Sequence, residues 1–163
     1  MSSSFLKLNF PQWQGSYDFS FQNNVSEIKE REPLIQFYSL GSKIVSLLFG
    51  SSHFKEVPDV PMPKKESSED LKIRNGIYAY NAIGNIKSTL KILEEKKPEK
   101  VLTVGGECSV SVPSFTYFAD KHKGKIAIIW IDAHPDISIP EDGYPGFHAM
   151  TLGAWMGICD KIF

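Results

Sequence analysis

Two carboxylates and an imidazole occur at alternate positions late in the chain, as Asp132, His134 and Asp136, directly after the apolar residues 126–131. If the backbone is extended there, alternate side chains point to the same side and the three donors can converge. Burying two carboxylates together costs free energy unless a cation neutralises them, and oxygen and imidazole ligands suit Mn, Mg, Zn or Fe. The pattern therefore predicts a metal site. The alternative is an aspartate that caps a helix beside ordinary surface residues.

A second candidate ligand, Cys108, follows the pair Gly105-Gly106 at the end of a predicted strand over residues 100–104. Paired glycines permit positive φ and a close approach of the backbone to a ligand. A thiolate is a soft ligand that suits Zn or Fe better than Mn, whereas a buried cysteine can also be a small apolar side chain. Both interpretations stay open. A catalytic nucleophile is a third, but no separate histidine–carboxylate pair is evident to activate the thiol.

His148 precedes an apolar segment that we expect to form a helix, and it can return toward the same site. An imidazole that titrates near neutral pH could relay protons to a leaving group. The alternative is a surface histidine at the start of a helix.

The elements that must position these residues alternate along the chain. Apolar residues recur at helical spacing over 33–49 and 76–97, and residues 111–121 fit one further helix. Short apolar runs predict strands over 5–10, 57–60, 100–104 and 126–131. We expect residues 16–30 to be irregular and residues 61–70 to resemble a linker. Alternating strands and helices predict the α/β class, with a parallel sheet flanked by helices and ligands at the carboxyl ends of its strands.

Composition excludes several classes of protein. The chain has 163 residues, 42% of them hydrophobic, which fits one globular domain with a buried core. Its net charge of −1 offers no overall attraction to nucleic acid or to an anionic membrane. Neither a signal peptide nor a run of membrane-spanning length is evident, so we expect a cytoplasmic protein. We also expect Cys108 and Cys159 to be reduced there.

Three motifs, GGECS at 105–109, WIDAHPD at 130–136 and FHAM at 147–150, resemble the arginase, agmatinase and formimidoylglutamase family (ureohydrolases) in type, order and spacing. The segment PQWQG at 11–15 is similar to a divergent bacterial branch of that family. The resemblance is strongest over residues 101–157. It implies a three-layer α/β/α fold.

The resemblance also implies roles for individual residues. Asp132 would bridge two metals, Asp136 would join it on the first metal and His134 on the second, while Cys108 stands where better-known members carry a histidine of the first site. His148 matches the proton-shuttling histidine of the family. The family generally uses two Mn ions, whose shared hydroxide attacks a guanidinium carbon. A small guanidino or formimino substrate is therefore expected.

The sequence departs from the family pattern in three ways. Cys108 replaces a histidine, which makes Zn or Fe an alternative to Mn. Ser138 and Gly146 stand where arginases use asparagines near the amino-acid end of the substrate, which argues against arginine itself. The second half of the family supplies an Asp-x-Asp pair of ligands, and this chain contains no Asp-x-Asp.

We therefore expect residues 1–163 to be the N-terminal half of one arginase-like domain, from a split or truncated protein. Such a half exposes a sheet edge, so a complementing C-terminal chain or a homo-oligomer is expected to cover it. The function implied is metal-dependent hydrolysis of linear non-peptide C–N bonds. The alternative is a catalytically silent metal-binding or assembly protein with the same fold.

Overall fold

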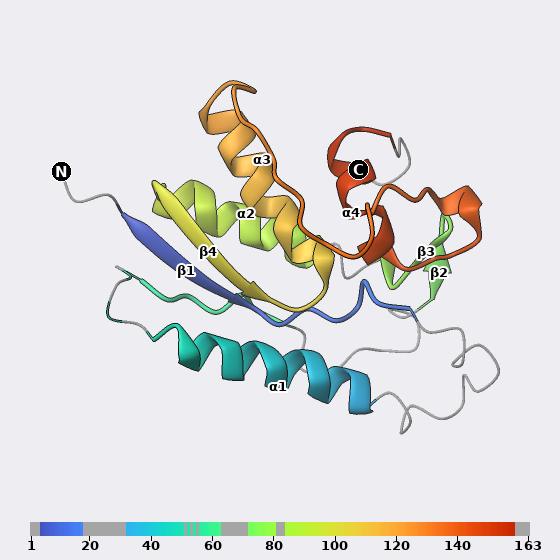
Figure 1. Ribbon diagram of the computed structural model, residues 1–163, viewed down its shortest axis with the longest axis horizontal. Coiled ribbons are helices and arrows are strands. Elements are labelled where there is room, and N and C mark those ends of the chain that lie inside the picture. Colours follow the sequence, from blue (N-terminus) through green and yellow to red (C-terminus); the bar gives the residue numbers. More distant parts are fainter. Residues whose placement is uncertain are drawn as a thin grey trace.

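In the computed structural model, a two-stranded parallel sheet lies between helices (Figure 1). The structure describes residues 4–17, 32–50, 52, 54, 56–62, 72–80 and 84–158. Strand β1 (Phe5–Phe10) pairs with β4 (Lys100–Gly105). Helix α1 (Glu32–Leu48) lies on one face of the sheet, and α2 (Gly84–Lys96) and α3 (Val112–Lys121) lie on the other. The predicted α/β class, with a parallel sheet flanked by helices, is confirmed.

The alternation of side chains along β1 explains how the strand joins these layers. Leu6 and Leu8 are buried with Leu93 of α2 and Tyr117 of α3 in one apolar cluster. Lys7 points to the opposite face, where its ammonium donates hydrogen bonds to backbone carbonyls at the end of α1. Because those last carbonyls have no partner within the helix, a buried cation is stabilised there.

Several predicted elements agree closely with the structure. Helix α1 and helix α3 match the predicted helices, and β1 and β4 match the predicted strands. The predicted strand over 57–60 is reduced to two isolated parallel bridges to β1, from Glu56 and Asp59. Residues 18–31 and 63–71, which contain most of the predicted irregular and linker segments, lie outside the described residues, as does Cys159.

The predicted helix over 76–97 is wrong in its first part. The structure forms an antiparallel hairpin of β2 (Ile73–Arg74) and β3 (Ile77–Tyr78), and α2 begins only at Gly84. The turn residues Asn75 and Gly76 have φ values of 52° and 78°. An Asn-Gly pair readily adopts positive φ at both positions and favours a two-residue hairpin turn. The apolar spacing that suggested a helix instead places Ile77 in the core.

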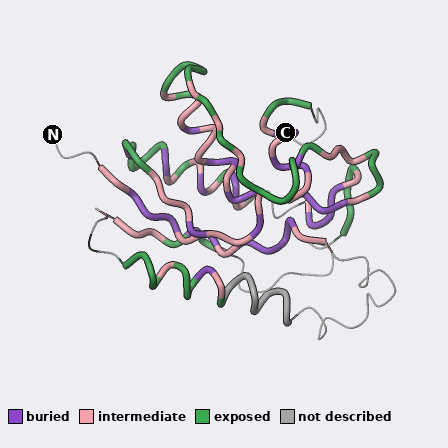
Figure 2. Tube along the Cα trace, viewed as in Figure 1, coloured by how far each residue is buried: buried purple, intermediate pink, exposed green. Residues whose placement is uncertain are grey.

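The predicted strand over 126–131 is also wrong, since these residues form no strand. In the described chain β4 pairs only with β1, and the segment itself makes only a local backbone hydrogen bond, from the Ile126 N–H to the Gly124 carbonyl. An apolar run becomes a strand only when another strand takes up its N–H and C=O groups. As a result Ile129 and Ile131 are 85% and 92% exposed. Figure 2 shows much of the trace after α3 in the colour of exposed residues.

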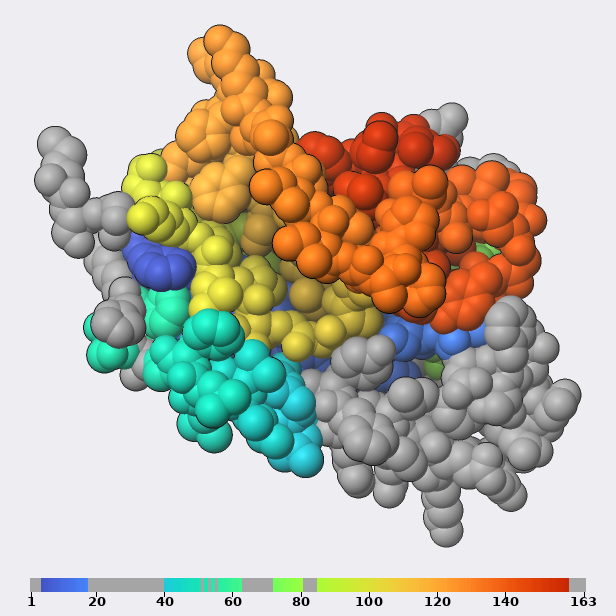
Figure 3. Space-filling model, viewed as in Figure 1, coloured from blue at the N-terminus to red at the C-terminus, as the bar shows by residue number. Residues whose placement is uncertain are grey.

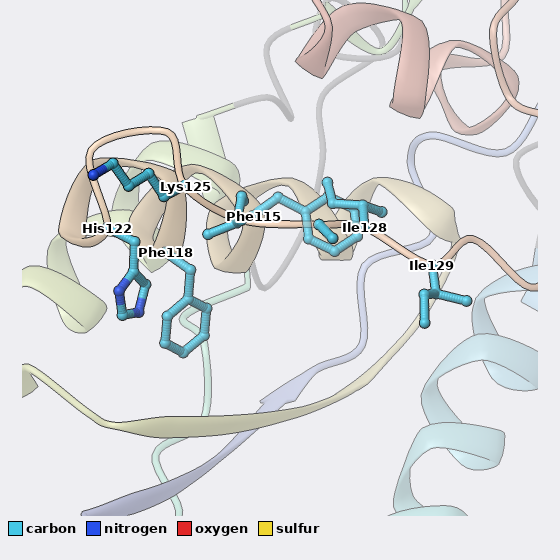
Figure 4. A pocket seen from close by; sticks show the side chains of 8 residues that line it. Phe115, Phe118, His122, Lys125, Ile128 and Ile129 are labelled. Carbon is cyan, nitrogen blue, oxygen red and sulfur yellow. The ribbon is translucent and has the colours of Figure 1, made fainter.

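This apolar segment runs across an open face of the molecule, beside β4 (Figure 3). It lines a pocket together with α3, in which Phe115 of the helix lies beside Ile128 of the segment (Figure 4). Phe118 and Ile129 line the same pocket.

Among the described helices, none combines the length and the apolar character that crossing a membrane requires.

Candidate metal centre

Three side chains from separate parts of the chain meet near the carboxyl end of β4. One possible ligand atom each from Cys108, Asp136 and His148 lies within 4.8 Å of the other two. Cys108 begins the 3-10 helix η4 (Cys108–Ser111), Asp136 lies in the loop after residues 126–131, and His148 lies in the 3-10 helix η6 (Phe147–Met150). Sulfur, oxygen and nitrogen donors gathered in this way could hold a divalent cation.

Asp136 combines a positive φ with a buried side chain. Its φ is 47°, and its carbonyl accepts hydrogen bonds from the N–H groups of Leu152 (2.9 Å) and Gly153 (3.0 Å) in α4 (Thr151–Trp155). The side chain is buried, and within the described part of the chain its Oδ2 atom has no hydrogen-bond partner. Burial raises the pKa of this carboxyl. A bound cation would relieve the cost of the unpaired buried oxygen, so the residue fits a metal ligand.

The thiol of Cys108 faces the two aspartates of the loop. Its Sγ lies 3.7 Å from Asp132 Oδ2. Burial raises the pKa of the thiol, and the neighbouring Asp136 carboxylate raises it further. Without a cation the sulfur is therefore protonated at neutral pH, whereas a coordinated metal deprotonates a thiol ligand.

The other two members of the predicted trio are exposed and lie outside this group of three. Asp132 accepts a hydrogen bond from the backbone N–H of His134 at 3.0 Å, and this bond lowers the pKa of the carboxyl. The indole of Trp130 donates to the His134 carbonyl at 3.2 Å. The structure brings Asp132 to Cys108, and Asp136 to Cys108 and His148, but it does not bring His134 into that group.

A buried polar network beneath Cys108 was not singled out from the sequence. Glu107 Oε1 accepts hydrogen bonds from Gln12 Nε2 at 2.7 Å and from the Ser109 hydroxyl at 2.5 Å. Burial raises the pKa of Glu107. The loop that carries Gln12 lies so close that a Cβ on Gly106 would be 1.9 Å from the Gln12 carbonyl oxygen. The position of Glu107 directly before Cys108 was the one available signal.

The environment of His148 was likewise not predicted. Its Nε2 atom lies 2.7 Å from the Tyr144 hydroxyl, which in turn donates to the Tyr17 carbonyl at 2.6 Å. The backbone N–H of His148 donates to the Gly15 carbonyl at 3.1 Å. The loop after β1 therefore contacts both segments of the site. Gln12 binds Glu107 next to Cys108, and Gly15 binds the backbone of His148. Nothing in the local sequence around Tyr144 indicated this contact.

Comparison with known proteins identifies the family of the chain. The family model described as the Arginase family matches residues 34–162. An arginase of Bacillus subtilis is 33% identical over 110 residues, which are 64% of this chain and 35% of the relative. An arginase of Staphylococcus aureus is 32% identical over 99 residues, 60% of this chain and 32% of the relative. The chain thus spans about a third of the length of these curated relatives. The family model covers most of the 163 residues, and the chain belongs to the arginase family.

Proposed function

We propose that this chain carries the metal-binding part of a hydrolase that cleaves linear, non-peptide C–N bonds in small guanidino or formimino compounds. The observation that carries the proposal is the meeting of Cys108, Asp136 and His148, with a buried carboxylate oxygen on Asp136 that has no hydrogen-bond partner among the described residues. The arginase-family relatives support a metal-dependent reaction of this type.

The residues at hand fit a divalent metal. Asp136 and Cys108 would hold it, with Asp132 close enough to Cys108 to join them. The family resemblance favours Mn, whereas the thiolate favours Zn or Fe. A divalent metal, when bound, supplies a strong nucleophile at neutral pH by lowering the pKa of water.

Asp132 and His134 would serve a second metal position, and His148 would transfer protons. Asp132 would bridge toward a second metal position, and His134, exposed beside it, would serve that second position. His148 would take up a proton and pass it to the leaving nitrogen, which needs a ring nitrogen with a lone pair near the cluster. Because Ser138 and Gly146 occur where arginases use asparagines, we expect a substrate other than arginine.

A catalytically silent metal-binding or assembly protein is the second candidate. The exposure of Asp132 and His134 favours it over a two-metal site formed by the described residues. A protein of this kind would bind metal weakly and turn nothing over.

We also propose that a further polypeptide, from a complementing chain or a second copy, covers residues 126–131. The support is the exposure of Ile129 and Ile131, together with the pocket that Ile129 lines with Phe115 and Phe118 (Figure 4). Extended apolar backbone of this kind is stabilised when another strand pairs with it.

The two candidates are separated by measuring turnover and bound metal together. Urea or formamide release would be assayed with arginine, agmatine, guanidinobutyrate and formiminoglutamate, with Mn, Zn or Fe supplied. Turnover that Asp132→Ala abolishes supports the hydrolase. No turnover and no stoichiometric metal, in the chain alone and after addition of a complementing chain, supports the silent protein.

A further inference from the structure

The hydrogen bonds around His148 determine which nitrogen of its ring carries the proton. The Tyr144 hydroxyl oxygen lies 2.6 Å from the Tyr17 carbonyl oxygen, and a carbonyl can only accept, so the proton between these oxygens belongs to Tyr144. A hydroxyl has one proton to donate. Its contact of 2.7 Å with His148 Nε2 must therefore be a bond that Nε2–H donates to the tyrosine oxygen.

We propose that Tyr144 is a positioning residue that holds His148 as the Nε2–H tautomer, so that the lone pair with which the ring can accept a proton or bind a metal lies on Nδ1. A neutral imidazole takes up a proton or a metal only through its lone pair. A hydrogen bond on the other nitrogen commonly fixes the tautomer of a functional histidine. The inference rests on the proposed function only for the use that is made of that lone pair.

Gly146 provides independent support, because it leaves room for the tyrosine ring. A Cβ at position 146 would lie 2.4 Å from Tyr144 Cε1 and 2.7 Å from its hydroxyl oxygen. Atoms that close would have to move apart. Glycine at this position therefore permits Tyr144 to reach His148, which any larger residue would hinder.

The acceptor for the Tyr144 hydroxyl is also held in place. The Tyr17 ring packs on Tyr78 with ring centroids 4.9 Å apart, and the backbone N–H of Tyr78, itself buried, donates to the Pro145 carbonyl at 2.8 Å. Tyr78 of the hairpin therefore contacts both Tyr17, whose carbonyl is the acceptor, and Pro145, which follows the donor Tyr144. The Tyr144 and His148 rings meet edge to face, with centroids 5.5 Å apart and planes at 89°.

The tautomer can be measured directly in the full chain without metal. The side chains of the four histidines would be labelled with ¹⁵N, the His148 signals identified by their loss in His148→Gln, and long-range ¹H–¹⁵N spectra recorded where the ring is neutral. The wild type should show the Nε2–H tautomer of His148. Tyr144→Phe should shift this signal toward a mixture of both tautomers.

Tyr117→Phe is the matched control. It also removes a phenol that donates to a backbone carbonyl, that of Pro98 at 3.1 Å, but away from the site. Its His148 signals should stay unchanged. A wild-type ring protonated on Nδ1, or the same tautomer population in Tyr144→Phe as in the wild type, would overturn the proposal. If Tyr144→Phe does not fold, the wild-type spectrum still decides the tautomer, and Gly146→Ala, which keeps the hydroxyl but displaces the ring, should produce the same mixture.

A titration with Zn²⁺ or Co²⁺ separates this inference from the proposed function. If His148 serves a metal site, Tyr144→Phe should weaken binding by roughly 10–100-fold, the range found when such outer partners are removed, and Tyr117→Phe should not. Equal affinity of Tyr144→Phe and wild type would exclude His148 as a metal ligand and is the result expected if His148 only transfers protons. A wild type that binds no metal would contradict the proposed function, while the tautomer spectrum would still stand as the test of Tyr144.

Discussion

The amide of Gln12 donates a 2.7 Å hydrogen bond to the carboxyl group of Glu107, although 95 residues separate the two in sequence. Both side chains are buried. This bond joins the loop after β1 to the loop after β4, directly before Cys108. The site therefore depends on a polar contact in the core as well as on the residues that face the cluster.

We expect Glu107→Gln to change how stability depends on pH. Burial raises the pKa of Glu107 in the folded chain above its ordinary value of 4.5. The folded state therefore holds this proton more tightly than the unfolded state, and the stability contributed is fully present below the ordinary pKa and is lost as pH rises through the folded pKa. Glutamine cannot ionise, so the free energy of unfolding of the variant, relative to wild type, should increase with pH over this window.

Urea unfolding of both proteins across a pH series measures this difference. The matched control is Glu99→Gln, which replaces an exposed glutamate and should leave the pH dependence close to that of the wild type. If the free energy of unfolding of Glu107→Gln and wild type changes with pH in the same way, the pKa of the Glu107 carboxyl is not raised in the folded chain.

The close approach of the two loops leads to a second prediction, that Gly106→Ala destabilises the fold. Its Cβ would lie 1.9 Å from the Gln12 carbonyl oxygen and 2.7 Å from the Gln12 nitrogen, and backbone atoms cannot move aside as a flexible side chain can. We expect a loss of about 1–3 kcal/mol or more in thermal or urea unfolding. Gly41→Ala in α1, where no atom lies within 4 Å of the new Cβ, should instead be neutral or stabilising. Equal stability of the two variants would argue against tight packing of Gly106.

The sequence predicted the elements whose patterns are local. The alternating and apolar residues of β1 and β4, and the helical spacing in α3, each point to one structure. At Ile77 the apolar spacing agreed with a helix, but the chain forms a hairpin there. The Asn75-Gly76 pair, which favours a two-residue turn, indicated the local structure better than the helical spacing of apolar residues. Residues 126–131 were predicted as a strand because an apolar run indicates burial, yet a pattern within one segment cannot show which strand will pair with it.

The candidate site was predictable to a similar extent. Motif spacing singled out Cys108, Asp136 and His148, which the structure brings together. Their supporting partners, Gln12 and Tyr144, were not predicted because each contact depends on how loops far apart in the sequence fold against each other. Exposure of His134 could not be foreseen either, since the alternation of donors assumed an extended backbone, and Asp136 adopts a positive φ.

Asp136→Asn should separate stability from metal binding. In the metal-free chain the buried carboxyl lacks a partner for Oδ2 within the described residues, and burial raises its pKa. A neutral amide avoids the cost of a buried charge, so the metal-free variant should be at least as stable as wild type above the ordinary pKa of an aspartate. Metal should stabilise the wild type against heat but not the variant. An equal rise in Tm for both proteins would remove Asp136 from the ligand set.

The exposed apolar segment leads to the last prediction, which concerns Ile129 and Ile131. Because these side chains are 85% and 92% exposed, Ile129→Lys and Ile131→Lys should change the free energy of unfolding of the chain alone by no more than about 0.5 kcal/mol. Ile77→Ala, at a residue with no exposed surface, should cost about 2–5 kcal/mol in the same measurement. If another polypeptide covers residues 126–131, the two lysine variants should weaken its association while the chain alone stays folded. Sedimentation velocity of wild type and variants over a range of concentrations, with and without a complementing chain, measures this. A large loss of stability in the isolated lysine variants would mean that residues 126–131 are already buried in the free chain, and no covering polypeptide would then be needed.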